Sequence, residues 1–494
     1  MRASSLIKLV ILGAVLAAPA RTALAHVGSP DVFYEGKAGP YALYVTVRPP
    51  EVIPGVADLQ IRAADPDIER LRVVPLPLSG DGAVFAPTPD LATRDKEDPQ
   101  TFGGHLWMMT AGSWQVRILV DGKRGSGELA VPVPTLPQRT AGMQAALGLT
   151  LLLCLLVLIA GLISIVGASS GEAQLPPGAA LTGAVLGQKR RAQLVAAALI
   201  GLCLWGGARW WREEAGRAAQ SVYRPLGMDA RVDGGTLTLQ LQGSGWQEQR
   251  LDDLLPDHDH LMHLFMLHEP ELEQVFHLHP SERAAGLFTV ELPAAPAGRY
   301  RLFADVVHAT GVPETLVAEL TLPAALPGVQ LGGDDAAGRG PPLREADPTR
   351  TSSPLSGGAQ LVWLREPGPL TARTPTLFRF RVEAPAGQPA TDLQLYMGML
   401  GHAAFVKRDG SVFAHVHPSG SVPMATLGLV AGAAQEKGGA GPAGHAGHQA
   451  PTGSLPAEVG FPYGFPGPGD YRIFVQLKRG GRIETGVFDA HVVK

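Results

Sequence analysis

The sequence predicts a mainly β protein: three immunoglobulin-like β-sandwich domains, with two transmembrane helices between the first and the second. Short runs that alternate apolar and polar residues recur along most of the chain, as expected of strands with one buried face. The 494 residues include 61 glycines and 43 prolines, a composition that favours frequent turns. Two long apolar stretches interrupt these runs, and each is a candidate membrane span.

The first predicted domain covers residues 26–140. Its alternating runs are separated by Pro and Gly at a spacing typical of a β-sandwich. The predicted strands are 41–47, 57–63, 70–76, 113–120 and 127–133.

The apolar stretches predict transmembrane helices at 143–168 and 192–211. The first has no charged residue, and the second has Arg209 near its end, where a long side chain can reach the membrane interface. The loop between them, 169–191, ends in the three basic residues 189–191. Because basic loops stay on the cytoplasmic side, we expect this loop in the cytoplasm.

Residues 1–25 have the pattern of a secretory signal peptide, with basic residues, a short apolar run and a small-x-small cleavage site at 23–25. The mature chain would begin at His26. Export of the N-terminus followed by two spans puts the first domain and the C-terminal half of the chain on the outer side of the membrane.

Two further predicted domains, 222–323 and 359–494, are repeats of each other, since PAGRYRLF (296–303) matches GPGDYRIF (467–474). We interpret the Gly- and Pro-rich residues between them, 324–358, as a flexible linker. A Gly-, Ala- and His-rich insertion in the second repeat, 428–455, is expected to be disordered. The first repeat has predicted strands at 236–242, 287–293, 300–307 and 315–323.

Each repeat carries a histidine motif. Residues 257–280 hold six of the 15 histidines, and 396–418 repeat the pattern, each copy ending in HxHP. Residues 253–263 align without a gap on 392–402, so that His263 matches His402.

A hairpin would gather these histidines on one face. Asp409-Gly410 predicts a two-residue turn in the second copy, which places His402 opposite His417 and His415 opposite Ala404. Because side chains alternate along a strand, all three imidazoles emerge on one face, close enough to share a cation. The longer turn of the first copy can pair residues in the same way, which gathers His263, His277 and His279.

The alignment also replaces histidine by methionine at two positions: His258 and His260 match Met397 and Met399. Imidazole suits copper, zinc and nickel, and thioether selects Cu(I), so the exchange is consistent with a site for a soft metal. Filling of the core by the methionines is the alternative. Strict alternation puts these positions on the opposite face, so a bend must bring them to the site.

His26 is a separate candidate ligand, because a free N-terminal amine and its own imidazole can chelate Cu(II), with His105 as a possible further donor. The only cysteines, Cys154 and Cys203, fall inside the predicted spans, which leaves His, Met and carboxylates as ligands outside the membrane. With 41 basic and 45 acidic residues, the charge is nearly balanced and gives no support for nucleic-acid binding. No nucleophile triad, phosphate loop or haem-attachment motif is present, so we expect no enzyme.

With these motifs in view, the extracytoplasmic regions resemble the FixH-like/YtkA-like family of bacterial envelope proteins, through the HxHP motifs and PAGRYRLF. The resemblance covers the two repeats best. It implies immunoglobulin-like β-sandwiches on the periplasmic side of a bacterial inner membrane, linked to copper handling and respiratory-oxidase maturation.

Two functions follow as expectations. The first is a membrane-anchored, envelope-exposed metal-binding protein for copper sequestration, resistance or delivery, with zinc and nickel as the other metals that imidazoles suit. Its partners would be the metal ion and a metal transporter or an oxidase-assembly protein. The alternative is a metal-independent scaffold or assembly subunit of a membrane complex.

Overall fold

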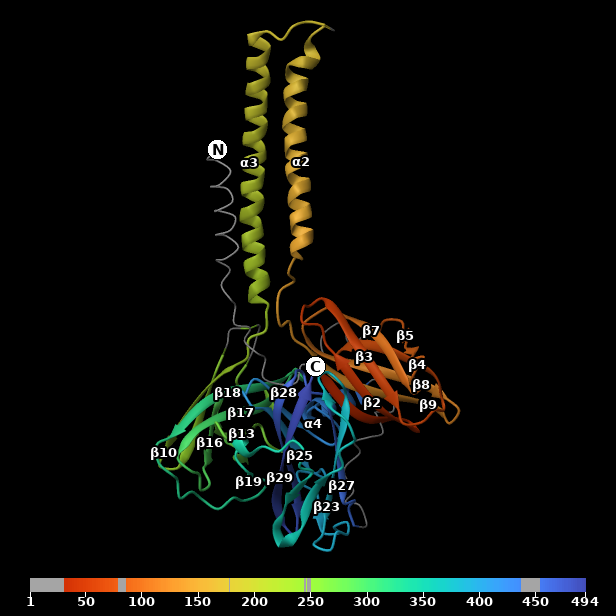
Figure 1. The fold of residues 1–494 in the computed structure, drawn as a ribbon, viewed down its shortest axis with the longest axis vertical. Helices are drawn as coiled ribbons and strands as arrows, with labels where there is room; N and C mark the ends of the chain where they lie inside the picture. The colour runs from red at the N-terminus through yellow and green to blue at the C-terminus, as the bar shows by residue number, and fades with distance from the viewer. Residues whose placement is uncertain (1–30, 79–85, 177, 244–245, 247–249, 437–453) are drawn as a thin grey trace.

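The computed structural model describes residues 31–78, 86–176, 178–243, 246, 250–436 and 454–494. The predicted signal peptide and His26 lie outside these residues. The described chain is mainly β with several antiparallel sheets and two long apolar helices, which confirms the coarse fold class (Figure 1).

The N-terminal region consists of two sheets that share one apolar core. One has the order β1-β2-β3-β7-β6, formed by Val32–Ala38, Tyr41–Arg48, Gly55–Ala63, Thr101–Met108 and Thr93–Arg94. The other has the order β5-β4-β8-β9, formed by Asp90–Leu91, Ile68–Pro77, Gly112–Gly122 and Gly125–Thr135. All five strands predicted in this region are present, because their alternation matches the buried and exposed faces.

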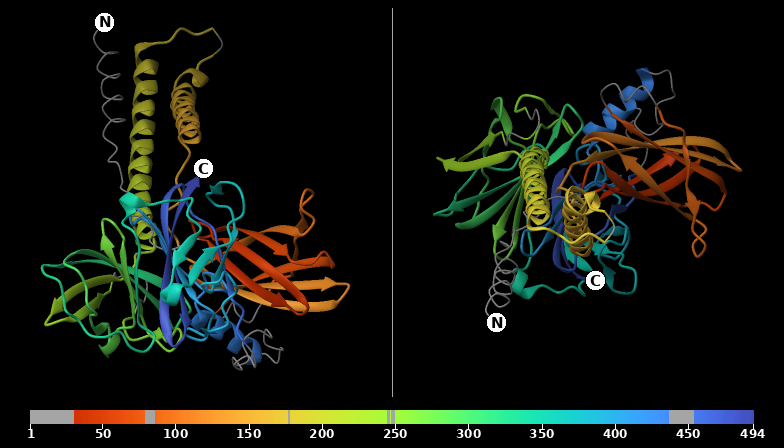
Figure 2. Two further views of the ribbon diagram at one scale, coloured as in Figure 1. Left: turned by 60° about the horizontal axis from the view of Figure 1, so that its bottom comes forward. Right: turned by 90° about the horizontal axis from the view of Figure 1, so that it is seen from above.

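The two helices are α2 (Ala145–Ser170) and α3 (Gly183–Gln220), which lie side by side (Figures 1 and 2). Both are long and apolar enough to cross a membrane, with mean hydropathies of 3.0 and 1.4 over their most apolar windows. The helix α3 extends beyond the predicted span at both ends, so the basic residues 189–191 are helical and the connecting loop is shorter than expected. All the β regions lie at one end of the helix pair.

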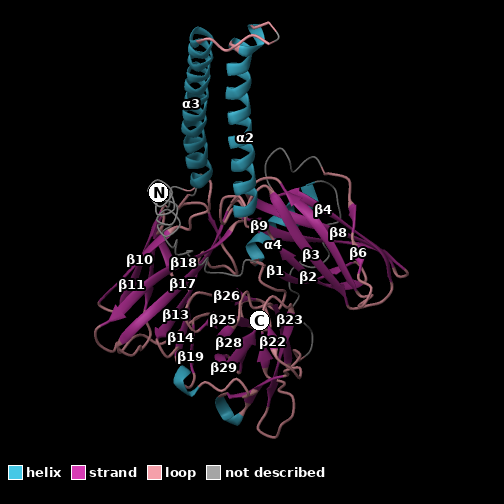
Figure 3. Ribbon diagram, turned by 45° about the horizontal axis from the view of Figure 1, so that its top comes forward, coloured by secondary structure: helices cyan, strands magenta, loops and turns pink. Residues whose placement is uncertain are grey.

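The first repeat also has two sheets around one core (Figure 3). One has the order β10-β11-β16-β15, formed by Gly227–Asp233, Thr236–Gln242, Leu287–Glu291 and Ser281–Ala284. In the other, β12-β17-β13-β14-β19, the strands are Leu254–Leu255, Gly298–His308, His263–Glu269, Gln274–Leu278 and Ala336–Arg339, and β18 (Pro313–Leu322) also pairs with β17.

The second repeat has the same plan. One sheet has the order β20-β21-β23-β27, formed by Ser352–Pro354, Gln360–Trp363, Thr376–Glu383 and Glu458–Tyr463. The other has the order β22-β29-β28-β25-β26, formed by Leu370–Thr371, Arg482–Val493, Gly469–Arg479, His402–Lys407 and Phe413–Val416, with β24 (Leu393–Gln394) paired to β28.

The prediction of a flexible linker was wrong, and the prediction of a disordered insertion was wrong over its first residues. The expected flexible linker, 324–358, contributes β19 to the first repeat and β20 to the second, and Leu343 between them is buried. The expected disordered insertion is helical over 428–436, as part of α4 (Met424–Glu436), and its residues 437–453 lie outside the described chain. Composition misled in both cases, because a few apolar side chains of these segments, such as Leu343 and Val430, are buried.

The two repeats pack on each other through an apolar interface. Phe303 of the first repeat stacks on Phe413 of the second, with ring centroids 4.5 Å apart. The interface core comprises Phe265, Leu267, Leu272, Val275, Phe303, Leu343, Ala404, Val406, Phe413, Phe474 and Val487. The guanidinium of the fully buried Arg472 donates to the carbonyls of Glu271, Leu272 and Pro341, and so ties the second repeat to the first.

Truncation of this interface is expected to destabilise the protein. Phe303→Ala removes a fully buried ring and should lower the free energy of unfolding by about 3–5 kcal/mol, the usual cost of such a cavity. Val329→Ala, at an exposed position of the same repeat outside this interface core, is the matched control and should change the free energy of unfolding little. Thermal unfolding of the detergent-solubilised chain measures both, and equal effects would contradict the assignment of Phe303 to an interface core.

Candidate metal centre

Both hairpins have the predicted register. In the first repeat Phe265 pairs with His277 and Leu264 with Leu278, which leaves His263 and His279 as the next opposed pair. In the second repeat Ala404 pairs with His415. The turn of the second hairpin is longer than the predicted two residues. The backbone N–H of Lys407 donates to the carbonyl of Val412, so the loop covers 408–411. The pairing is preserved because 409 and 410 remain at its centre.

The predicted bend is present in both copies as a tight turn before the hairpin. Asp257 and His260 form one bridge, and Tyr396 and Met399 form the equivalent one. The central residues of each turn have positive φ, 50° and 69° at residues 258 and 259, and 49° and 77° at 397 and 398. A type I′ turn has this signature, and it reverses the chain so that residue 258 can face the hairpin histidines.

The first histidine group is His263, His277 and His279, whose ligand atoms lie within 4.8 Å of one another. The Nδ1 atom of His263 is 3.2 Å from Nε2 of His277 and 3.2 Å from Nε2 of His279. A metal about 2.0 Å from each nitrogen in tetrahedral geometry holds its ligand atoms about 3.3 Å apart. The spacing therefore fits a metal ion at the centre of the group.

Acceptors around this group fix which ring nitrogen carries the proton. Nε2 of His263 donates to the carbonyl of Asp257 at 3.0 Å, and Nδ1 of His279 donates to the Asp335 carboxylate at 3.0 Å. Nδ1 of His277 donates to Oε1 of Gln476 at 2.9 Å. Each imidazole thus donates outward and turns its lone pair inward, which is the orientation that metal sites impose through their outer hydrogen bonds.

The second histidine group is His258, His402 and His417, also within 4.8 Å. Nε2 of His402 donates to the carbonyl of Tyr396 at 3.3 Å, as its counterpart His263 does to Asp257. Nε2 atoms of His258 and His417 are buried without a hydrogen-bond partner among the described residues. Buried polar atoms usually have partners, so these two nitrogens point to a ligand.

His258 comes from the first repeat but belongs to the second group. Its ring centroid is 5.1 Å from that of His402 and 5.0 Å from that of His417. The sequence alone would assign it to its own hairpin. The repeat interface brings the turn of one copy over the hairpin of the other, and so the two groups adjoin.

The other two motif histidines lie beside the groups. His260 stacks on His279 with a centroid separation of 3.9 Å. His415 has its Nε2 atom 3.2 Å from Nδ1 of His402 and its ring 5.4 Å from that of His263, so it lies between the groups. All eight predicted histidines of the two repeats therefore form one cluster.

The methionines occupy the turn of the second copy, where Met399 is buried and Met397 is half-buried. Their role as ligands stays a prediction. His105 is apart from the cluster: its side chain is 77% exposed and bonded to Asp58 at 2.8 Å.

Burial keeps the fully enclosed imidazoles neutral. Desolvation, reinforced by the neighbouring imidazoles, lowers the pKa of His277, His402 and His415 well below the usual 6.5. Desolvation also lowers the pKa of His263 and of His417 to about 4. The neutral ring is the form that binds metal, so the cluster is ready to bind without losing protons.

Sequence reasoning missed the outer partners. Asp305 and Gln476 occupy equivalent positions in the two repeats. Asp305 is paired with His263 on the neighbouring strand, and Gln476 is paired with His402. Each reaches the other repeat: Gln476 accepts from His277, and Asp305 is 3.5 Å from Nδ1 of His415. The match of PAGRYRLF to GPGDYRIF, extended by two residues, would have aligned them.

Acid should destabilise the metal-free protein. Unfolded histidine binds a proton near pH 6.5, whereas folded His263 and His417 do so only near pH 4. Below pH 6.5 the unfolded chain therefore binds more protons, and the free energy of unfolding falls by about 1.4 kcal/mol per pH unit for each such histidine. The free energy of unfolding is therefore highest above pH 6.5 and falls as the pH is lowered towards 4. Unfolding midpoints measured between pH 7.5 and 4.5 test this. The control is the double variant His263→Leu/His417→Leu, whose midpoint should depend less steeply on pH. If the midpoint of the variant fell with pH as steeply as that of the wild type, the prediction would be contradicted.

The comparisons with known proteins add little about function. Residues 230–323 and 358–494, which are the two repeats, match a family described as a domain of unknown function, DUF8832. No curated protein matches the chain.

Solved structures show only distant likenesses. A tetra-tandem repeat from the extending region of a large adhesion protein is 9% identical, with 89% of this chain and 71% of that chain covered and a TM-score of 0.16. Salmonella α2-macroglobulin reacted with methylamine is 9% identical, with 94% and 24% covered and a TM-score of 0.21. A membrane-anchored protein from Corynebacterium diphtheriae is 8% identical, with 94% of each chain covered and a TM-score of 0.15. In sequence, the two repeats are similar to the DUF8832 family.

Proposed function

We propose that this chain is a non-enzymatic, membrane-anchored copper-binding protein that holds the metal between its two repeats, for sequestration, resistance or delivery. One observation carries the proposal: in the first group the inward-facing Nδ1 of His263 lies 3.2 Å from Nε2 of His277 and 3.2 Å from Nε2 of His279, and an outer acceptor holds each ring in this orientation. Converging lone pairs repel one another, and a cation at their centre converts that repulsion into bonding.

Copper in its reduced state suits the donors best. Both groups are made of neutral imidazoles, and no thiolate is present among the described residues outside the helices. A monovalent ion is easier to bury than a divalent one in such a neutral pocket, because the desolvation cost rises with the square of the charge. Met397 and Met399 occupy the turn of the second copy, and as ligands they would add thioethers, which select Cu(I). Zinc and nickel are the competing metals.

The location follows from the helices and the placement of the β regions. Both helices could cross a membrane, and all the β regions lie at one end of them (Figure 1). The basic residues 189–191 lie near the other end, which favours that end in the cytoplasm. We infer that the β regions are immunoglobulin-like domains of the FixH-like/YtkA-like kind on the periplasmic side, where a metal transporter or an oxidase-assembly protein would be the partner.

Replacing ligands should weaken copper binding at the group that is altered. The triple variant His402→Ala/His415→Ala/His417→Ala removes two of the three histidines of the second group. A separate variant, His277→Ala, removes one histidine of the first group. In each variant the affinity for copper at the altered group should fall by at least about 100-fold. His491→Ala is the matched control, because this histidine is exposed and bonded to Asp470 away from the cluster. Copper analysis after equilibrium dialysis of the purified full chain measures the loss. A triple variant that binds as much copper as the wild type would refute the proposal and favour the metal-independent scaffold.

His258 should distinguish two sites from one. With two groups, the wild type is expected to bind two copper ions, and His258→Ala should bind one tightly, since the first group keeps all three ligands. His268→Ala is the control, because this histidine of the same motif is bonded to Glu273 outside both groups. Unchanged stoichiometry in His258→Ala would mean that the turn of the first repeat contributes no ligand to the second.

A further inference from the structure

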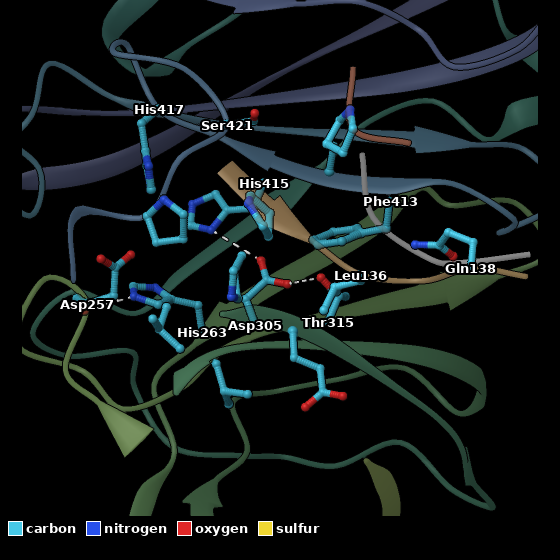
Figure 4. A pocket seen from close by; sticks show the side chains of 18 of the residues that line it. Leu136, Gln138, Asp257, His263, Asp305, Thr315, Phe413, His415, His417 and Ser421 are labelled. Atoms are coloured by element: carbon cyan, nitrogen blue, oxygen red, sulfur yellow. Dashed lines mark hydrogen bonds and ion pairs between the residues drawn. The ribbon is translucent and has the colours of Figure 1, made fainter. Parts of the chain in front are cut away.

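We propose that the cavity between the three β regions is the passage by which the ion reaches and leaves the centre, with Asp305 and His415 as the donors that transfer it. This inference rests on the proposed metal binding and adds its route. The cavity, of about 150 Å³, is lined by Glu51 and Gln138 of the N-terminal region, Asp305 and Thr315 of the first repeat, and His415 and His417 of the second (Figure 4).

Donor groups lead inward from this cavity in order of decreasing exposure. The side chain of Glu51 is 58% exposed at the mouth, that of Asp305 is 23% exposed, and that of His415 is 5% exposed. His402 behind them is fully buried. An ion can therefore reach Asp305 from solvent. His263 and His417 line the cavity themselves, whereas His402 does not line it and adjoins His415.

The distances allow transfer between neighbouring donors. Asp305 is 3.5 Å from Nδ1 of His415, and Nε2 of the same ring is 3.2 Å from Nδ1 of His402. Thr315 donates to Asp305 and fixes the carboxylate at the cavity floor, as Figure 4 shows. The carboxylate accepts a hydrated ion, and the imidazoles replace its remaining waters one by one, a ligand exchange in which no electron moves.

The mouth of the cavity lies where both helices join the β regions. Gln138 belongs to the segment between β9 and α2, and its backbone N–H donates to the carbonyl of Glu51 at 2.8 Å. Tyr223, which follows α3, donates to Glu314 on the opposite wall, and its backbone N–H bonds to the carbonyl of Pro137. The passage thus opens beside the bases of both helices.

Plugging the mouth tests the passage. Gln138→Trp should slow both copper loading and copper release by about tenfold or more, as a gated approach does, and should leave the dissociation constant unchanged because both directions use one route. Gln138→Ala, which widens the mouth, is the matched control and should load at least as fast as the wild type. Stopped-flow loading of the full chain with Cu(I), and release to a chelator, give the two rates. Wild-type rates in Gln138→Trp would overturn the passage.

Neutralising the carboxylate tests the transfer role separately. Burial raises the pKa of Asp305 to about 7, so the measurement is made at pH 8, where the group is a carboxylate. Asp305→Asn keeps the shape of the cavity floor but removes this charge, and should slow loading by about tenfold or more while both groups still fill at equilibrium. Loss of an ion at equilibrium, with an unchanged loading rate, would make Asp305 a permanent ligand and overturn its role in transfer. Failure of the wild type to bind copper would instead refute the proposed function, so the two failures are distinguishable.

Discussion

The structure depends on a conflict between burial and polarity at the repeat interface. Four imidazoles of the cluster are buried and the other four are partly buried, and the acceptors around the first group turn its lone pairs towards one another. Such an arrangement is costly for an empty protein, because converging lone pairs gain no hydrogen bonds. The neighbouring apolar interface around Phe303 and Phe413 supplies the stability that offsets this cost, so the histidines are held in place before any ion arrives.

Much of the hairpin geometry could be predicted from the sequence, because strand register depends on local pairing. The turn centred on Asp409-Gly410 fixes which residues oppose each other, and alternation then gathers the histidines on one face. The bend at His258 was also predictable, since strict alternation would have left the 258 and 260 positions facing away. These inferences need only the geometry of one hairpin.

Contacts between the repeats could not be predicted in this way. The assignment of His258 to the group of His402 depends on how two domains pack, and no local pattern encodes that packing. The same holds for the residues around Leu343, where a composition typical of a linker conceals a few side chains that are buried between the repeats. Packing of distant segments overrides local composition in both cases.

The contribution of the first repeat's turn to the second histidine group indicates how the protein could have arisen. If each repeat was once a separate chain, two copies would have paired, and the turn of each would have contributed to the site of its partner. Gene duplication and fusion would then have made the partner permanently available at a high effective concentration. Fusion also freed the two copies to diverge, and the change from His258 and His260 to Met397 and Met399 is the kind of difference that a symmetric dimer of identical chains cannot have.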